Sequence, residues 1–167
     1  SVNLGLGSVD IISISIDPLN DLIYLLDEYD GIHVCDYDGN IIESKYLSDD
    51  GVEFGQDQGI EYDVEQGLLY VVKDSGEESA VALYDFESHS VVNRYNFNLT
   101  TQGNARDVTL LNNFVYVALN DGNGNDEINP PQIIRLTKEL TNPVGFGRRV
   151  DVLSTASGDF YDPWKFV

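Results

Sequence analysis

The segment from Asp121 to Glu127 carries residues whose types and spacing could do chemistry. Oxygen-bearing side chains stand at alternate positions in it, at Asp121, Asn123, Asn125 and Glu127. Calcium takes about six to eight oxygen ligands, and flexible loops often supply them. We favour a solvated loop that holds no cation, with calcium as a candidate cofactor at these four residues as the alternative interpretation.

The start of this segment resembles an EF-hand calcium loop, but its later positions depart from that pattern. Asp126 occupies the place of the glycine that such a loop needs, and Gln132 occupies the place of its bidentate glutamate. The expectation of calcium therefore depends on the clustered oxygen atoms alone.

The sequence shows no catalytic signature. It has no Gly-x-Ser-x-Gly elbow, phosphate loop or paired zinc motif. Cys35 is the single cysteine, so we expect a half-buried structural thiol rather than a nucleophile. His33 and His89 have no metal ligand at a suitable sequence spacing, and we expect neither to be catalytic. We assign no catalytic residue, which favours a protein that is not an enzyme and leaves an enzyme as the alternative.

The charge balance is strongly acidic. The chain has 29 acidic and 9 basic residues, which gives a net charge of −20. Nucleic acid is an improbable partner, because its binding needs lysine and arginine. A surface this negative attracts cations or basic partners, and adaptation to salt or to extracellular surroundings is the other interpretation. We expect an extracellular, periplasmic or cell-surface location. No apolar run reaches the roughly 20 residues of a membrane helix, so we expect no membrane insertion.

Three related segments recur along the chain, and each contains a tyrosine in an apolar run. Tyr24, Tyr70 and Tyr116 are spaced 46 residues apart. A period of roughly 40 to 50 residues with several short strands is typical of β-propeller blades. We therefore expect an all-β fold with blades of four antiparallel strands, and the tyrosines at equivalent places in the second strands.

The expected strands divide residues 1–167 into one partial propeller domain. Its blades are placed at about 10–56, 57–104 and 105–162, and a further blade begins at 163–167. The expected strands are 14–16, 22–26, 31–35 and 41–47, then 60–62, 68–72, 80–84 and 91–97, then 108–110, 114–119, 133–136 and a poorly patterned one within 142–152.

These segments resemble the NHL repeat family of propellers. Its pattern of Gly, Phe, Pro and Gly before an apolar strand is met in part by Phe54, Gly59, Phe160 and Pro163, and the Tyr-Val strand that follows is met by 69–72 and 115–118. Asp57, Lys73, Leu119 and Lys165 depart from that pattern. Lactonase-type, calcium-binding and PQQ-like propellers are the alternatives.

Three blades and the start of another cannot close a ring, since propellers have about four to eight blades. Either the sequence is part of a longer chain, which we favour, or two copies complete one ring. An unpaired strand edge invites association. We therefore expect additional blades, from the same or another chain, or a protein or glycan partner.

Several loops are expected to gather on one end of the propeller, where propellers usually bind ligands. These loops precede the first strand of each blade or join its second and third strands. The candidate ligand face consists of Asp27, Asp30, Asp74, Glu77, Asp107, Tyr161 and Trp164. In an enzyme, Asn104, Asp107 or Asp57 would surround the central axis.

The sequence thus favours a non-catalytic binding module of a secreted or surface-associated NHL-like propeller, which presents acidic loops to a protein, glycan or cation. One alternative is part of a metal-dependent propeller enzyme of the lactonase, lyase or phosphoesterase type. The other is a structural set of blades in a larger extracellular assembly.

Overall fold

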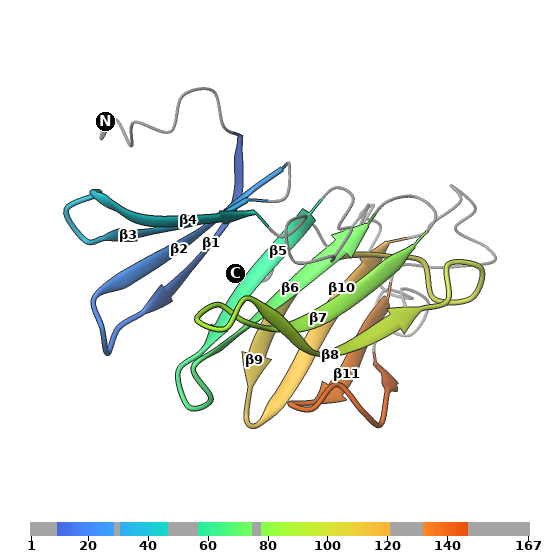
Figure 1. The fold of residues 1–167 in the computed structure, drawn as a ribbon. Coiled ribbons are helices and arrows are strands. Elements are labelled where there is room, and N and C mark those ends of the chain that lie inside the picture. Colours follow the sequence, from blue (N-terminus) through green and yellow to red (C-terminus); the bar gives the residue numbers. More distant parts are fainter. Residues whose placement is uncertain (1–9, 29–30, 47–56, 75–77, 121–131, 147–167) are drawn as a thin grey trace, which may run out of the picture.

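The computed structural model describes residues 10–28, 31–46, 57–74, 78–120 and 132–146. These residues form strands and turns without any helix, and the strands lie in three antiparallel sheets of four strands each (Figure 1). The described sheets do not close into a ring. The predicted all-β fold of blades in an incomplete propeller is therefore confirmed. None of the described segments forms a helix long and apolar enough to cross a membrane.

Each sheet is a meander in which strands that follow one another in sequence are also neighbours. Blade 1 contains β1 (Ile11–Asp17), β2 (Leu22–Asp27), β3 (Gly31–Asp36) and β4 (Ile41–Tyr46). Blade 2 contains β5 (Asp57–Asp63), β6 (Leu68–Asp74), β7 (Ser79–Asp85) and β8 (Ser90–Phe97). Blade 3 contains β9 (Asn104–Leu111), β10 (Phe114–Asn120), β11 (Gln132–Thr137) and β12 (Val144–Phe146).

The three repeated tyrosines occupy equivalent positions, as the spacing predicted. Each is the third residue of the second strand of its blade. On the first strand their partners are Ser15 for Tyr24, Glu61 for Tyr70 and Thr109 for Tyr116. This register makes Ser15, Glu61 and Thr109 equivalent residues of the three blades.

A bulge recurs at one place in every first strand. The extra residue is Ile12 in β1, Gln58 in β5 and Arg106 in β9, and in each case it lies two residues before the equivalent of Ile60. Bulges sharpen the local twist of a strand. The blades therefore repeat in their irregular features as well as in their strand pairing.

Blade 2 is buried on both faces because a blade packs on each side of it. Tyr70, Val72, Val81 and Leu83 join the core shared with blade 3. Their sequence neighbours Leu69, Val71, Ala82 and Tyr84 join the core shared with blade 1. Successive side chains of a strand point to opposite faces, so two-sided burial explains the continuous apolar runs of β6 and β7.

The first strands of the blades are neighbours in space. β5 contacts both β1 and β9, and in Figure 1 β1 lies to the left of β5. First strands surround the central axis in a propeller. Side chains on β1, β5 and β9 are therefore in position to line that axis.

Candidate functional site: a polar cavity on the innermost strands

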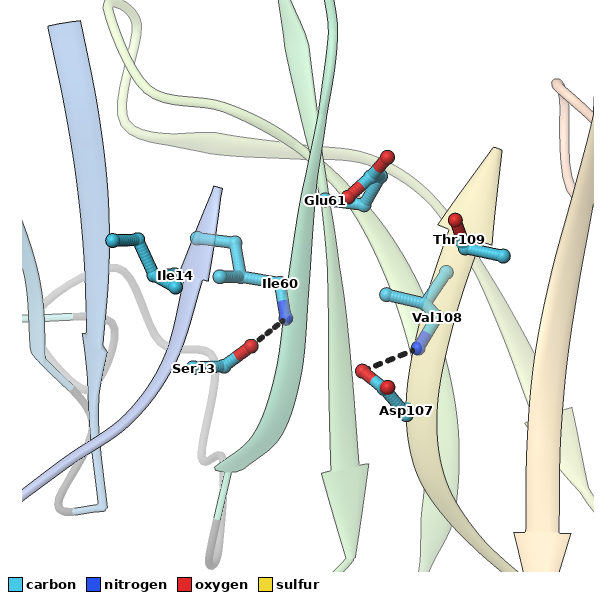
Figure 2. A pocket seen from close by; sticks show the side chains of 7 residues that line it. All are labelled: Ser13, Ile14, Ile60, Glu61, Asp107, Val108 and Thr109. Carbon is cyan, nitrogen blue, oxygen red and sulfur yellow. Dashed lines mark hydrogen bonds between the residues drawn. The ribbon is translucent and has the colours of Figure 1, made fainter. Parts of the chain in front are cut away.

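A cavity of about 210 Å³ lies on the three innermost strands. Its lining comes from all three blades, and Figure 2 shows the lining side chains on β1, β5 and β9. The lining residues are Ser13, Ile14, Ile60, Glu61, Asp107, Val108 and Thr109.

Two serines form the β1 side of the site. Ser13 Oγ accepts a hydrogen bond from the backbone N–H of Ile60 at 3.3 Å, and Ser15 Oγ accepts one from Tyr62 at 2.8 Å (Figure 2 shows the first of these). The serines are buried while Ile14 and Ile16 are exposed. This reverses the usual amphipathic pattern because the serines satisfy buried N–H groups of the next blade.

A close backbone approach forms the opposite side of the site. A Cβ atom on Gly59 would lie 2.7 Å from Asp107 Oδ1 and 3.0 Å from the Asp107 Cα atom. Only glycine fits there without displacing β9. The Asp107 Oδ1 atom accepts the backbone N–H of Val108 at 3.0 Å, which holds this carboxylate at the cavity.

Glu61 connects the three strands. Its carboxylate accepts hydrogen bonds from the Leu110 backbone on β9 and from the Ser15 side chain on β1. Burial raises the pKa of Glu61 above its ordinary value, and the negative charge of Asp107 adds to that increase, while the two hydrogen bonds oppose it. The ionised form of Glu61 is therefore less favourable here than it is for an exposed glutamate.

The lining combines two carboxylates with the hydroxyl groups of Ser13 and Thr109, and it contains no basic side chain. Such a surface can accept hydrogen bonds from a cationic or hydroxyl-bearing group. Among the described residues no three His, Cys, Asp or Glu side chains are grouped to hold a metal ion.

Among the residues proposed from sequence for the ligand face, Asp107 lines the cavity. Asp27 and Asp74 are buried and lie beside basic partners: Asp27 Oδ2 is 3.6 Å from His33 Nε2, and Asp74 Oδ2 is 3.0 Å from Arg106 Nη1. Asn104 and Asp57 begin β9 and β5. The remaining candidates lie outside the described residues and stay predictions: Asp30, Glu77, Tyr161, Trp164, Asp121, Asn123, Asn125 and Glu127.

Sequence reasoning missed Ser13, Glu61 and Thr109. The usable signal was the register of the repeats, because Ser15, Glu61 and Thr109 each stand one residue after the aligned apolar residues Ile14, Ile60 and Val108. A polar residue that recurs directly after the aligned apolar residue of each repeat indicates positions that can line one common cavity.

The remaining reactive side chains have structural surroundings. Cys35 is a free thiol that is buried rather than half-buried as the sequence predicted, and burial raises its pKa. His33 lies beside Asp27, and its Nδ1 atom is 2.8 Å from Ser44 Oγ. That pairing joins three strands of blade 1 and could not be read from sequence spacing. His89 lies in the turn after β7 and stacks on Phe86.

Comparison with known proteins supports the fold. The sequence matches no protein family and no curated protein. A protein of unknown function from Bacteroides caccae superposes on 84% of this chain and 47% of its own, with a TM-score of 0.51 and 11% identity. Hydrazine synthase from Kuenenia stuttgartiensis superposes on 75% of this chain and 38% of its own, with a TM-score of 0.57 and 16% identity. The chain thus spans less than half the length of either structure.

Proposed function

We propose that this chain is a non-catalytic binding module, and that its inner cavity binds a positively charged group of a partner molecule. The observation that carries this proposal is the lining of the cavity. It contains the carboxylates of Glu61 and Asp107 and no basic side chain. The net charge of −20 acts in the same direction, because it attracts basic partners over a longer range.

The electrostatics of Glu61 give the interaction its driving force. Burial and the neighbouring Asp107 charge both disfavour its ionised form. An ammonium or guanidinium group in the cavity would neutralise the pair and favour that form. Binding near the raised pKa of Glu61 is therefore accompanied by proton release, and the affinity increases with pH over the range in which Glu61 ionises.

The test uses tetralysine as the probe and its fully Nε-acetylated form as the control, in isothermal titration calorimetry. We expect Glu61→Gln and Asp107→Asn to weaken tetralysine binding by about tenfold each, which corresponds to about 1.4 kcal/mol. Glu87→Gln is the matched control, since Glu87 is an exposed acid in the turn after β7. Equal binding of the two peptides, or equal losses in all three variants, would contradict a cation site in the cavity.

We further propose that the blades are NHL-like, that the protein acts outside the cell or at its surface, and that calcium binds near Asp121. The first two proposals rest on the blade motifs and on the acidic composition, and the third rests on the alternating oxygen ligands. Binding to the folded state raises the melting temperature. Calcium should do so more than sodium chloride of equal ionic strength, and an equal response would reduce the effect to screening.

The position of Asp107 at the cavity also keeps the metal-dependent enzyme as a second candidate. An enzyme of that type needs a tightly bound metal at the axis. Elemental analysis of the purified protein separates the two candidates, because a stoichiometric metal that survives dialysis and is lost in Asp107→Asn would favour the enzyme.

A further inference from the structure

A second, larger cleft adjoins the inner cavity. It has a volume of about 430 Å³, lies where β5 and β9 end, and is lined by 61–65, 110–113 and Lys138. Glu61 lines both the cavity and the cleft, so the two hollows share one wall. Figure 2 shows Glu61 and Thr109 at one end of the cavity, and Ser13 and Asp107 at the other. The walls of the cleft come from blades 2 and 3, which pack against each other, so its shape requires no further blade.

The charged groups that belong to the cleft alone are paired with one another. Lys138 Nζ lies 2.9 Å from Asp63 Oδ2 and 2.8 Å from Glu65 Oε2. These contacts show that an ammonium group on an aliphatic stem fits against carboxylates of this lining. They also mean that a second ammonium group in the cleft would meet the charge of Lys138 and find both acids already paired. The place for the cation of a ligand is therefore the inner cavity, beside Glu61 and Asp107.

The rest of the cleft is neutral. Val64, Leu110 and Leu111 supply apolar surface, and Asn112 and Asn113 supply amide groups. Both asparagines are exposed in the turn between β9 and β10, at φ angles of 50° and 65°. An asparagine amide both donates and accepts hydrogen bonds, and so does a peptide group. This part of the lining is therefore complementary to an extended peptide, as the inner cavity is complementary to a cation.

The spacing between the two hollows matches the length of a lysine side chain. A strand rises by about 3.4 Å per residue, so Leu111 lies about 7 Å beyond Thr109 along β9. An extended lysine side chain carries its ammonium group a similar distance from its backbone. A lysine whose backbone lies over Leu111 can therefore place its ammonium group beside Glu61.

We propose that the partner is a protein, and that it inserts one lysine side chain from an otherwise uncharged, extended segment. The ammonium group lies in the inner cavity beside Glu61, and the backbone of the segment lies in the cleft against Asn112 and Asn113. This inference rests on the cation site of the proposed function, and it adds the class of the partner and the residues that select it. A free polyamine fits less well, because it has no peptide groups for the asparagines and brings a second charge towards Lys138.

The experiment is a titration of the isotopically labelled chain, followed by nuclear magnetic resonance. One probe is the peptide Gly-Gly-Lys-Gly-Gly with an acetyl and an amide cap. The other is n-butylamine, which reproduces the lysine side chain without a backbone. We expect the peptide to bind about tenfold more tightly than butylamine. The peptide should also shift the side-chain amide signals of Asn112 and Asn113, which butylamine leaves in place.

Glycine variants test the asparagines without straining the turn. Asn112→Gly and Asn113→Gly remove the amide groups, and glycine adopts positive φ angles readily. Each variant should weaken peptide binding by about threefold or more and leave butylamine binding unchanged. Asn142→Gly is the matched control, because Asn142 is an exposed asparagine with a φ of 52° that lines neither hollow. It should change the binding of neither probe.

Glu61→Gln separates this inference from the cation site itself. If it weakens both probes while the asparagine variants bind the peptide normally, the cation site stands and the peptide segment is overturned. If neither probe binds, or if Glu61→Gln changes the binding of neither, the cation site is overturned as well. Tighter binding of decamethylenediamine or of a glucosamine oligomer than of the peptide would overturn the protein partner in favour of a polyamine or a glycan.

Discussion

The two junctions between blades have the same backbone register but different chemistry. At the junction of blades 1 and 2 the contacts are serine hydroxyls and aromatic rings, with Tyr24 stacked on Tyr62 at 4.9 Å. At the junction of blades 2 and 3 they are a glycine, two carboxylates and an ion pair between Lys138 and Asp63. The register, and not the identity of the side chains, is what the repeat preserves.

This difference means that the junctions should respond differently to substitution and to pH. The serine junction depends on short neutral acceptors that could be exchanged for one another. The carboxylate junction combines a backbone approach that leaves no room for a side chain with buried acids that must be paired. We expect the second junction to be the more easily broken.

The largest effect should come from Gly59→Val. The new Cβ would lie 3.0 Å from the Asp107 Cα atom, which is backbone and cannot move aside cheaply. Overpacking of this kind costs about 1–3 kcal/mol or more. Gly145→Val is the matched control, since nothing lies within 4 Å of a Cβ there. Urea unfolding of both variants measures the difference, and equal losses would contradict a tight junction.

Lys138→Met should have the next largest effect. Its Nζ atom lies 2.9 Å from Asp63 Oδ2, and Asp63 is almost fully buried. Loss of this partner leaves a buried carboxylate without its cation, which costs about 2–3 kcal/mol for a hydrogen bond to a charged group.

The comparison at the first junction is Lys45→Met. Lys45 Nζ donates to the backbone carbonyl of Phe86 and lies 4.0 Å from the centroid of its ring, so no buried acid there loses its partner. We expect Lys138→Met to lower the free energy of unfolding more than Lys45→Met does. The reverse order in urea unfolding at neutral pH would contradict the charged character of the second junction.

Ser15→Ala should produce a smaller loss, of about 1–2 kcal/mol, because it leaves the partly buried N–H of Tyr62 without its acceptor. Ser15→Thr keeps the hydroxyl and should recover most of that loss. Thermal unfolding of the two variants provides the test. Equal losses in Ser15→Ala and Ser15→Thr would mean that the changed packing of the side chain lowers the stability and that the hydrogen bond does not contribute.

The sequence predicted the second and third strands well, because continuous apolar runs such as 68–72 are recognisable without knowledge of their partners. It predicted the first strands too short: 14–16 became Ile11–Asp17, and 108–110 became Asn104–Leu111. Ser13 and Asp107 lie outside the strands predicted from sequence, and the role of Ser13 and Ser15 as acceptors depends on a neighbouring blade. The cavity combines strands from three blades, so its lining could not be derived from local patterns.

The smallest effect, Glu61→Gln, tests the sign of the electrostatics at the second junction. The folded-state pKa of Glu61 is raised, mainly by burial and further by Asp107. Its contribution to stability is therefore fully present below the unfolded pKa of about 4.3 and is lost as the pH rises through the folded pKa. Glutamine keeps a carbonyl oxygen for the Leu110 N–H and carries no charge.

We therefore expect Glu61→Gln to be more stable than the wild type at pH 7, by less than about 1 kcal/mol because Glu61 is only partly buried, and to match it near pH 4. Urea unfolding across this pH range gives the difference directly. Glu87→Gln, on an exposed turn, should show no such trend. If the variant is instead less stable at pH 7, the interactions of the ionised carboxylate with Leu110 and Ser15 stabilise the junction more than the burial of its charge destabilises it.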